Sequence, residues 1–516
     1  MTRSACDDKI LRKNEGIAFD LRTKGIKMKK IAVLLICASA FVFANALYAV
    51  RANVYAYPAE TPKSENFIVK IGGAECFAYR AEVADIAAFD FDGTGELNVE
   101  IKCLRGAKSA VVRPLSAGIT PKIEDGTISF SISKPQYLSV EIDGDLERPL
   151  FLFASPEEKL NFKKGDPNVV WFDGGKTHNI GVSRKIKGGE TVYIEGGAVV
   201  RGSFLVGERA AGSLQKSVKI CGRGILTGED MPVAAKFRKD QHALEKLPYS
   251  KLIECHRIVG LEIEGIISTG SPSWTTALFA CDDVSIRNYK VVSGSARQHS
   301  DDGIDIVGSK NVLVENCFIR TKDDSITLKG AKLTRIKKIA YVEQNAPNTV
   351  ENITVKDSVI WNHIHGNALE IGYETVCDEI RNIRFENIDI IHSLNNPGWM
   401  NPVETTFSIH NADRGTVRDV LYKNIRVEDP QVAIIYFAIM DSVYTVDKTR
   451  GKISNIRFED IFITTKTPLI AIFKGRDAVS NISGITFKNF YINGKKIKSL
   501  QDLNAQTAFA DGFVFE

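Results

Sequence analysis

Two patterns of apolar and polar residues follow each other along the chain. From residue 50 to about residue 160, short runs alternate apolar and polar positions, as in FIVKI (67–71) and TISFSI (127–132), and Gly, Asp and Pro interrupt them. A period of two places successive side chains on opposite faces of a strand, and frequent turn residues are typical of antiparallel sandwiches. The pattern predicts a small β-sandwich domain over residues 50–160.

From residue 165 to about residue 510 a short phrase of the form N-[IV]-x-[IVF]-x-[ND] recurs, without helical periodicity. Its copies, 28 to 41 residues apart, are DVSIRN (283–288), NVLVEN (311–316), NITVKD (352–357), NIRFEN (382–387), DVLYKN (419–424), NIRFED (455–460) and GITFKN (484–489). Such repeats predict a right-handed parallel β-helix rather than a propeller, whose blades need hairpins, or a leucine-rich repeat, which needs helices. Asn and Asp tolerate left-handed dihedrals, so we expect them to stack from coil to coil. The predicted fold class is all-β, a β-helix preceded by the sandwich.

The first 49 residues have the pattern of a leader rather than of a folded domain. Within residues 28–49, Lys29 and Lys30 precede an apolar run from Ile31 to Phe43, and Ala44-Asn45-Ala46 is a small-x-small cleavage site. The run has 13 residues, well short of the ~20 that a membrane-spanning helix needs. We therefore expect a signal peptide, export to the periplasm or the medium, and no stable membrane insertion of the mature chain.

The charge changes the picture only once the leader is removed. The 516 residues include 67 Lys+Arg and 63 Asp+Glu, and nine of the basic and four of the acidic residues lie in the leader, so 58 and 59 remain. A nearly neutral mature chain gives no electrostatic case for nucleic-acid binding. Seven cysteines remain, of which Cys76 and Cys103 could pair and those in the repeats are expected to be buried filler. No CxxC or HxxxH spacing occurs, so we expect neither a metal nor a cofactor.

Two acidic segments, SDDGID (300–305) and KDDSITLKG (322–330), carry the candidate chemistry. Side chains on adjacent coils of a β-helix stack about 4.8 Å apart, and the short spacing between Asp302 and Asp323 would place these two at similar positions, with Asp324 beside them. Clustered carboxylates repel one another, which raises at least one pKa. A protonated carboxyl beside an ionised one is what glycoside hydrolysis requires. Solvated turn aspartates and a calcium site are the alternatives.

These segments, together with GNALEIGYE (366–374), resemble the polygalacturonase family, glycoside hydrolase family 28, whose motifs read N-T-D-G-I-D, G-D-D-C-I-A-I-K-S-G and G-H-G-I-S-I-G-S-E. The resemblance implies an inverting hydrolase in which Asp323 is the general acid while Asp302 and Asp324 hold and activate water. An inverting mechanism leads us to expect a wide separation of the carboxyl groups.

The chain departs from the family 28 pattern at three places. Ser300 replaces an Asn, Asn367 stands where the family has His, and no R-I-K triplet follows to bind a galacturonate carboxylate. A sandwich ahead of a β-helix also resembles family 49, the dextranases and isopullulanases, which implies a neutral α-glucan. Pectic and neutral substrates therefore both stay open.

Further residues are candidates for substrate binding because of their position or chemistry. The aromatic faces of Trp274 and Tyr373 could pack on a sugar ring, although core packing is an equal alternative. Lys329 follows the aspartate pair at the family's Lys position, and His299 lies just before the first acidic segment. The full set of candidates is His299, Lys329, Asn367, Glu370, Trp274 and Tyr373.

Together these patterns predict an exported inverting glycoside hydrolase with a three-aspartate mechanism that acts on a polysaccharide or oligosaccharide. Two alternatives remain. A polysaccharide lyase on the same fold would need calcium and a Lys or Arg base beside an acidic sugar, and a non-catalytic carbohydrate-binding β-helix protein would need neither.

Overall fold

The computed structural model describes residues 52–208, 214–231, 251–294, 300–330, 348–394, 404–430 and 433–516. The predicted signal peptide lies outside these residues and stays a prediction. The described chain is built from strands, with one short 3-10 turn at Leu115–Ala117. Within the described ranges, no helix has the length and apolar character to cross a membrane. The all-β fold class predicted from the repeats is confirmed.

Two sheets form the N-terminal β-sandwich. One has the order β1-β5-β11-β10-β7 with β4 paired to β5, and the other has the order β3-β2-β6-β9-β8. Their inward side chains, such as Val99 and Leu138, share one apolar core. Most pairs are antiparallel, but β5 and β11 run parallel, which the alternating pattern did not indicate. The strands of the first sheet are β1 (Ala52–Val54), β4 (Ala78–Arg80), β5 (Asp85–Phe91), β7 (Ala110–Arg113), β10 (Gln136–Ile142) and β11 (Asp145–Pro156), and those of the second are β2 (Phe67–Ile71), β3 (Ala74–Cys76), β6 (Leu97–Cys103), β8 (Lys122–Glu124) and β9 (Thr127–Ile132).

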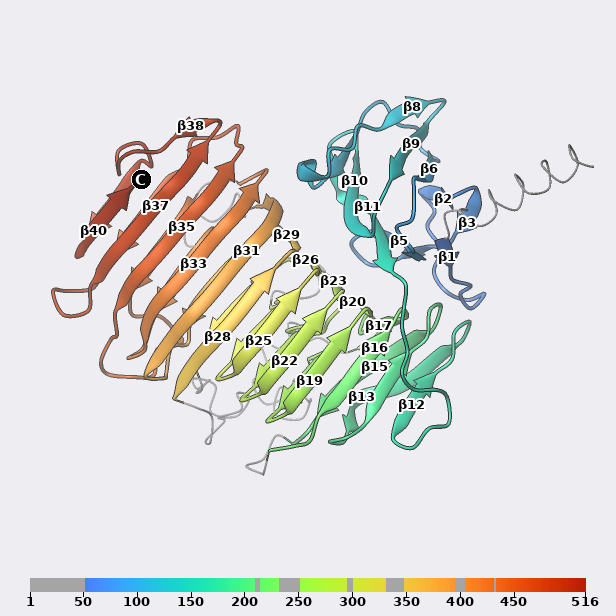
Figure 1. Ribbon diagram of the computed structural model, residues 1–516, viewed down its shortest axis with the longest axis horizontal. Helices are drawn as coiled ribbons and strands as arrows, with labels where there is room; N and C mark the ends of the chain where they lie inside the picture. Colours follow the sequence, from blue (N-terminus) through green and yellow to red (C-terminus); the bar gives the residue numbers. More distant parts are fainter. Residues whose placement is uncertain are drawn as a thin grey trace, which may run out of the picture.

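The remaining strands wind into a parallel β-helix with three faces around one long apolar core (Figure 1). The first face contains β12 (Val169–Phe172), β14 (Thr191–Ile194), β16 (Val218–Gly222), β19 (Val259–Glu264), β22 (Asp282–Arg287), β25 (Lys310–Glu315), β28 (Thr349–Lys356), β31 (Glu379–Ser393), β33 (Thr416–Val427), β35 (Ile453–Ile463), β37 (Ile482–Ile492) and β40 (Ala510–Phe515). The second face contains β13 (Thr177–Ile186), β15 (Val199–Val206), β17 (Ile225–Thr227), β20 (Ile267–Thr269), β23 (Lys290–Val292), β26 (Phe318–Thr321) and β29 (Val359–Asn362), and the long strand β31 continues it.

The third face contains β18 (Ile253–His256), β21 (Thr276–Phe279), β24 (Ile304–Val307), β27 (Ile326–Lys329), β30 (Leu369–Tyr373), β32 (Thr405–Asn411), β34 (Ala433–Ile439), β36 (Ile470–Lys474) and β39 (Ala505–Ala508). Among the described strands of this solenoid, only the two-residue strand β38 (Lys495–Lys496) runs antiparallel to its neighbour. Along the third face, apolar side chains such as Ile304 and Ile326 enter the core, so the alternate positions Asp305 and Thr327 lie on the outer side of the sheet.

The predicted stacking of Asn and Asp between coils is confirmed on the first face. Asn316 donates from Nδ2 to Asn288 Oδ1 at 2.6 Å, and Asn387 donates in the same way to Asp357 Oδ1 at 2.6 Å. These corner residues have positive φ, for example +51° at Asn316. The first position of the repeated phrase forms a second ladder, in which Asn352 Nδ2 lies 2.8 Å from Asn311 Oδ1. Each copy of the phrase is therefore an extended segment that begins and ends at a residue of positive φ, and in β31, β33, β35 and β37 the strand continues beyond both of these residues.

The cysteines of the described chain are buried and form no disulfide with one another, and burial was expected for those in the repeats. Cys255, Cys281 and Cys317 lie in the core of the β-helix among Ile, Leu and Val side chains. Cys76 and Cys103, which the sequence allowed to pair, are also free and belong to the sandwich core.

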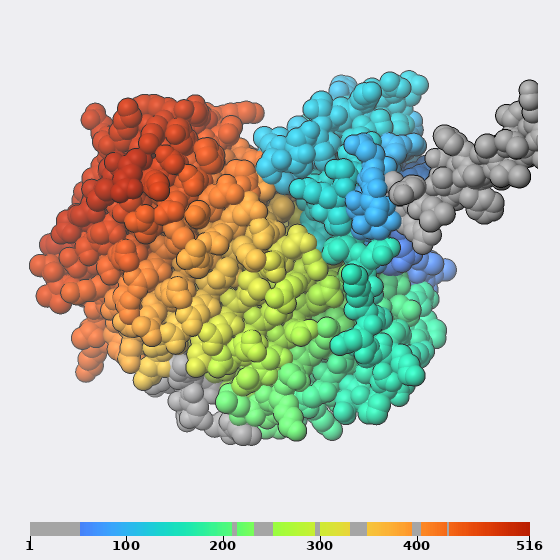
Figure 2. Space-filling model, viewed as in Figure 1, coloured from blue at the N-terminus to red at the C-terminus, as the bar shows by residue number. Residues whose placement is uncertain are grey.

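The sandwich packs against the second face of the β-helix (Figures 1 and 2). Phe151 and Phe153 of β11 contact Phe318 of β26 with ring centroids 4.8 and 5.0 Å apart, and Phe151 also meets Trp361 of β29 edge to face at 5.8 Å. These rings are fully buried. The apolar contact therefore supports β26 and β29, which lead directly into the two turns described below.

Buried ion pairs complete this contact between the two domains. Arg223 donates from Nε to Asp90 Oδ1 at 2.8 Å, and both side chains are more than nine-tenths buried. His392 lies between Glu141 of the sandwich, 2.8 Å from Nε2, and Asp429 of the solenoid, 2.9 Å from Nδ1. Because a buried charge without its partner is costly, these pairs fix the orientation of the sandwich on the solenoid.

Candidate active site

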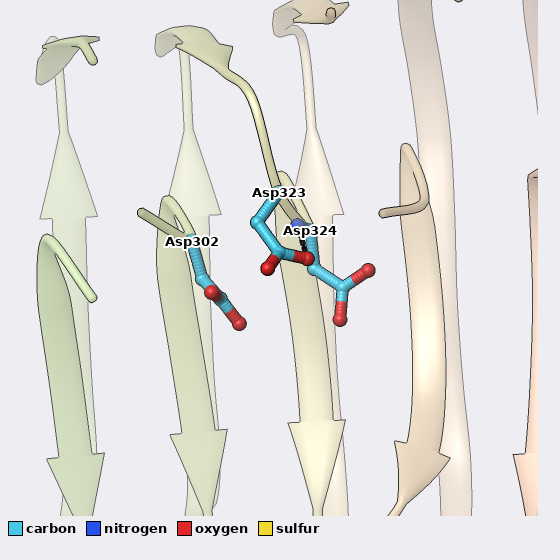
Figure 3. A group of neighbouring side chains, drawn as sticks. All are labelled: Asp302, Asp323 and Asp324. Atoms are coloured by element: carbon cyan, nitrogen blue, oxygen red, sulfur yellow. Dashed lines mark hydrogen bonds between the residues drawn. The ribbon is translucent and has the colours of Figure 1, made fainter. Parts of the chain in front are cut away.

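The three aspartates that the sequence singled out meet at one edge of the third face. Asp302 lies in the segment that leads into β24, and Asp323 and Asp324 form the turn between β26 and β27 on the next coil. Figure 3 shows their carboxylates turned to the same side of the two coils. One oxygen from each lies within 4.8 Å of an oxygen of the others. The cluster is therefore tight, and the expectation of a wide separation between the carboxyl groups is wrong.

The backbone register sets which residues stack. Ile304 pairs with Ile326, so Asp302 is aligned with Asp324 rather than with Asp323. The spacing of the two acidic segments placed Asp302 and Asp323 at similar positions on adjacent coils, and the register confirms this to within one residue. Ile326 pairs in turn with Leu369, which places Asn367 in register with Asp324 on the following coil.

The turn that carries Asp323 is held by hydrogen bonds on both sides. Thr321 Oγ1 and Asn362 Nδ2 each donate to the Asp323 carbonyl at 2.7 Å. Asp324 N donates to Asp323 Oδ1 at 2.9 Å, which fixes the direction of this carboxylate. Gly366 of the next coil lies against the turn, because a Cβ there would stand 2.6 Å from Asp323 Oδ1 and 2.4 Å from Asp324 N. Only glycine fits at this approach.

Burial and mutual repulsion perturb all three carboxyl groups. Asp302 and Asp324 are more than nine-tenths buried, whereas Asp323 is partly exposed. Burial, followed by the charges of Asp305 and Asp323, raises the pKa of Asp302 well above its usual value. Burial and the neighbouring Asp324 likewise raise the pKa of Asp323. The cluster therefore retains a proton at a pH where isolated aspartates are all ionised.

The three carboxyl groups differ in the hydrogen bonds and charges that surround them. Asp324 Oδ1 accepts hydrogen bonds from Asn367 N at 2.7 Å and from Asn367 Nδ2 at 2.9 Å, which favour the ionised form. Asp302 lies 3.7 Å from the Lys329 ammonium group. Among the described residues, the Asp323 carboxylate accepts one hydrogen bond, from the backbone N–H of Asp324. The two hydrogen bonds to Asp324 favour its ionised form, whereas burial and neighbouring charges raise the pKa of both Asp302 and Asp323, so the retained proton lies on one of these two.

Lys329, predicted from its position after the aspartate pair, lies behind the cluster. Its Nζ is 3.4 Å from Asp305 Oδ1 and 3.8 Å from Glu374 Oε2, in addition to Asp302. Although burial opposes it, the charges of Glu374, Asp305 and Asp302 raise the pKa of Lys329 well above its usual value. The lysine is therefore a permanent cation that neutralises part of the acidic charge.

The other predicted substrate residues occupy different surroundings. Trp274 is partly exposed, and the ammonium groups of Lys329 and Lys251 lie 4.4 and 5.0 Å from its ring centroid. Asn367 is buried and bonded to Asp324. His299 lies outside the described residues. The assignment of these side chains to sugar binding stays a prediction.

Glu370 and Tyr373, both on β30, belong to a buried group that also contains His410. His410 Nδ1 lies 3.0 Å from each Glu370 carboxylate oxygen, and both side chains are fully buried. The Tyr373 ring stacks on His410 at 4.4 Å and 7°. No spacing in the sequence pointed to a partner for His410, because the pair joins β30 and β32 on different coils.

Tyr444 is a further residue at the site that the sequence reasoning missed. It is half-exposed, and its ring centroid lies 5.6 Å from that of Tyr373. Burial and the charge of Glu374 raise its pKa, and Asp323 and Asp302 add to the effect, so the hydroxyl lies near the carboxylates. No motif surrounds it, and it lies in the loop between β34 and β35.

The three aspartate oxygens are close enough to surround a single cation. The groups around them already supply positive charge, however, since Lys329 faces Asp302 and two N–H groups occupy Asp324 Oδ1. The described residues therefore favour a shared proton over a bound ion, and the geometry suits acid–base chemistry on a substrate.

Comparisons with known proteins point to the same chemistry. Residues 173–398 match the model of glycosyl hydrolases family 28. The chain is 26% identical over 295 residues to a probable exopolygalacturonase B of Neosartorya fischeri, covering 54% of this chain and 59% of that protein. It is 24% identical over 263 residues to a probable exopolygalacturonase B of Aspergillus terreus, covering 48% and 55%. The chain thus spans less than two thirds of the curated relatives it matches.

The fold is similar to that of a solved structure over nearly its whole length. Dex49A from Penicillium minioluteum matches with a TM-score of 0.60 and 14% identity, covering 90% of this chain and 96% of that one. At this identity the likeness concerns the fold alone.

Gly366→Ala tests the close approach beneath the aspartate turn. Gly366 has φ +70° and its added Cβ would meet Asp323 and Asp324, whereas Gly494 has φ +75° with no heavy atom near its Cβ. The left-handed dihedral alone costs an alanine about 1–2 kcal/mol, and overpacking adds about 1–3 kcal/mol. We expect Gly366→Ala to lower the free energy of unfolding clearly more than the control Gly494→Ala in chemical denaturation. Equal losses would contradict the close packing.

Proposed function

We propose that this protein is an inverting glycoside hydrolase that cleaves glycosidic bonds in a polysaccharide or oligosaccharide, because residues 173–398 match the model of glycosyl hydrolases family 28, the family that the acidic motifs resemble. The observation that carries the proposal is the convergence of Asp302, Asp323 and Asp324 from two coils, where burial and mutual repulsion raise the pKa of the carboxyl groups. The curated relatives are named exopolygalacturonases, which supports the reaction class.

Asp323 is the general acid in this mechanism. It is the most exposed of the three aspartates, so a glycosidic oxygen can reach it, and it holds the proton that repulsion retains in the cluster. Protonation of the leaving oxygen by a positioned carboxyl group contributes roughly 10²–10⁴-fold to the rate.

Asp302 and Asp324 hold and activate the attacking water. Their oxygens lie within 4.8 Å of each other, and a water molecule that makes a hydrogen bond of about 2.8 Å to each could lie between them. Inverting enzymes with two carboxyl groups usually keep them about 6.5–9.5 Å apart to leave room for water. Here a third carboxylate is present, so the acid and the pair that holds water are separate groups and the cluster can be tighter.

The charges at the site favour a neutral sugar over a uronate. The cation that contacts the aspartate cluster, Lys329, is already surrounded by three carboxylates, and His410 is bonded to Glu370. A sugar carboxylate placed about 4 Å from an uncompensated carboxylate would cost about 4 kcal/mol at an effective dielectric constant of about 20. We therefore extend the proposal to a neutral polysaccharide.

The two alternative functions have less support from the described residues. A lyase would need a lysine or arginine free to act as base beside an acidic sugar, and the surrounding carboxylates keep Lys329 protonated. A non-catalytic binding protein would have no need for three repelling carboxylates at a buried site, because their burial costs stability.

Export is also part of the proposal and rests on the basic, apolar and small-residue pattern of residues 28–49. We expect the mature protein to begin close to residue 47, and N-terminal sequencing of protein recovered outside the cytoplasm checks this. An N-terminus at Met1 or Met28 would contradict it.

Asp323→Asn tests the acid directly. We expect at least a 100-fold loss of kcat, because the amide cannot protonate the leaving oxygen, with an unchanged melting temperature. New reducing ends measure the reaction, and Asp511→Asn, at an exposed aspartate of the last coil, is the matched control. Proton NMR of the first product gives the stereochemistry. Full activity of Asp323→Asn would refute the acid, and a retained anomeric configuration would refute inversion.

Substrate charge is tested by comparing dextran, pullulan, polygalacturonate and rhamnogalacturonan under one set of conditions. We expect kcat/KM for the best neutral glucan to exceed that for polygalacturonate at least 100-fold. Efficient hydrolysis of polygalacturonate would overturn the proposed neutral substrate while leaving the hydrolase in place. Products that absorb in the ultraviolet would indicate a lyase instead.

A further inference from the structure

Hydrogen bonds to the protein engage both the backbone and the side chain of Asn367, which leaves little of it to bind a sugar. It is 3% exposed and lies in the turn before β30, in register with Asp324 on the preceding coil. Its N and Nδ2 both donate to Asp324 Oδ1, at 2.7 and 2.9 Å. Its carbonyl accepts from Ser325 N at 2.8 Å. The protein thus engages both its backbone and its side chain.

The next coil determines the orientation of the Asn367 amide. Thr405 N donates to Asn367 Oδ1 at 2.8 Å, so this oxygen faces away from Asp324 and the Nδ2 group faces toward it. The opposite orientation would place an oxygen against the carboxylate and a donor against the Thr405 N–H. Three successive coils, through Asp324, Asn367 and Thr405, therefore fix one another at a single point.

We infer that Asn367 is a positioning residue that holds the Asp324 carboxylate in one orientation and in its ionised form, rather than a contact for the sugar. The inference rests on the proposed hydrolase function. Both donors meet the same oxygen, Oδ1, and the described residues make no hydrogen bond to Oδ2. One oxygen is therefore fixed by the protein, and the other is left for the water that Asp324 activates.

The groups that face Asp324 explain why such a residue is needed. Burial and the charge of Glu370 raise the pKa of Asp324, whereas Lys329 and the hydrogen bonds from Asn367 lower it. Without these donors the proton of the cluster could move from Asp323 to Asp324, and the base would be lost. The charged or titratable groups that face this carboxyl are Asp302, Asp323, Lys329, Glu370 and Tyr373.

Two substitutions of Asn367 separate the effect of an added negative charge from the effect of losing the hydrogen bond to Asp324. Asn367→Asp keeps the shape and can still accept from Thr405 N, but it loses the Nδ2 donor and adds a carboxylate beside Asp324. Asn367→Ala loses the same donor without added charge and keeps the backbone donor. The matched control is Asn316→Asp, which makes the same exchange in the asparagine ladder of the first face, where the side-chain partner is Asn288 rather than an aspartate of the cluster.

The acid limb of the kcat/KM profile against pH is the main measurement, because it reports the pKa of the base in the free enzyme. A raised pKa leaves less of the base ionised at a given pH, so the limb moves to higher pH. We expect a shift of at least one pH unit and a 100-fold loss of kcat for Asn367→Asp. For Asn367→Ala we expect a smaller shift and at least a tenfold loss. KM should change less than threefold in both, and Asn316→Asp should match the wild type.

The outcomes distinguish failure of this inference from failure of the proposed function. A raised KM with an unmoved acid limb would show that Asn367 contacts the sugar, and unchanged kinetics would show that it has no role. If the wild type hydrolyses none of the polysaccharides, the proposed function fails. Carboxyl ¹³C NMR then still tests whether Asn367 holds Asp324 in its ionised form. The Asp324 signal is assigned through the variant Asp324→Asn. Its titration midpoint must be higher in Asn367→Asp than in the wild type, and an equal midpoint would overturn the inference.

Discussion

The pairing of backbone between β24, β27 and β30 is the constraint on which the site depends. Parallel strands stack about 4.8 Å apart, and this spacing carries over to the side chains in the segments that precede them. Asp302, Asp324 and Asn367 are in register on three coils although they lie far apart along the chain. A solenoid can therefore hold the carboxylates of Asp302 and Asp324 close together, because the paired backbone of the adjacent coils fixes their positions. The repulsion that results is offset locally, by the Lys329 ammonium and the Asn367 donors.

The position of the sandwich follows from the same constraint. Its aromatic contact covers Phe318 and Trp361, which lie on the strands that enter the turns of Asp323 and Gly366. A turn between two strands moves only if a strand moves, so packing on the second face rigidifies a site at the edge of the third. Arg320 adds to this support, because its guanidinium donates to the Ser293 carbonyl at 2.6 Å and lies 5.8 Å from the Trp361 ring centroid. The N-terminal domain thus braces the strands that position the aspartates.

Much of this arrangement could be predicted from the sequence, and the limits have physical causes. The repeated phrase marks left-handed corners, and Asn and Asp are the residues that tolerate them, so the fold class followed from local chemistry. The acidic segments were found because their spacing is close to the length of one short coil. The spacing gave similar positions on adjacent coils, but the exact register depends on hydrogen bonds between coils. The pair Glu370–His410 could not be predicted, because it joins strands on different coils and no local signal encodes that. The ring of Tyr444 could not be predicted either, because it lies in the loop between β34 and β35.

The departures from the family 28 motifs are consistent with one another once the register is known. The Asn at position 367 offers two N–H groups to Asp324 and cannot itself become charged, so it favours the ionised form of that carboxyl group. On β32, the next strand of the third face, Ser408 pairs with Glu370 of β30 and His410 pairs with Gly372. All of these positions lie on the outer side of the sheet. His410 is bonded to Glu370 there, and so is not a free cation for a sugar carboxylate. Asn367 carries no charge and His410 is bonded to Glu370, so neither offsets the carboxylates of the aspartate cluster. An acidic site retains a proton among its carboxyl groups and repels an anionic ligand, so the proposed acid catalysis and the proposed neutral substrate rest on the same charges.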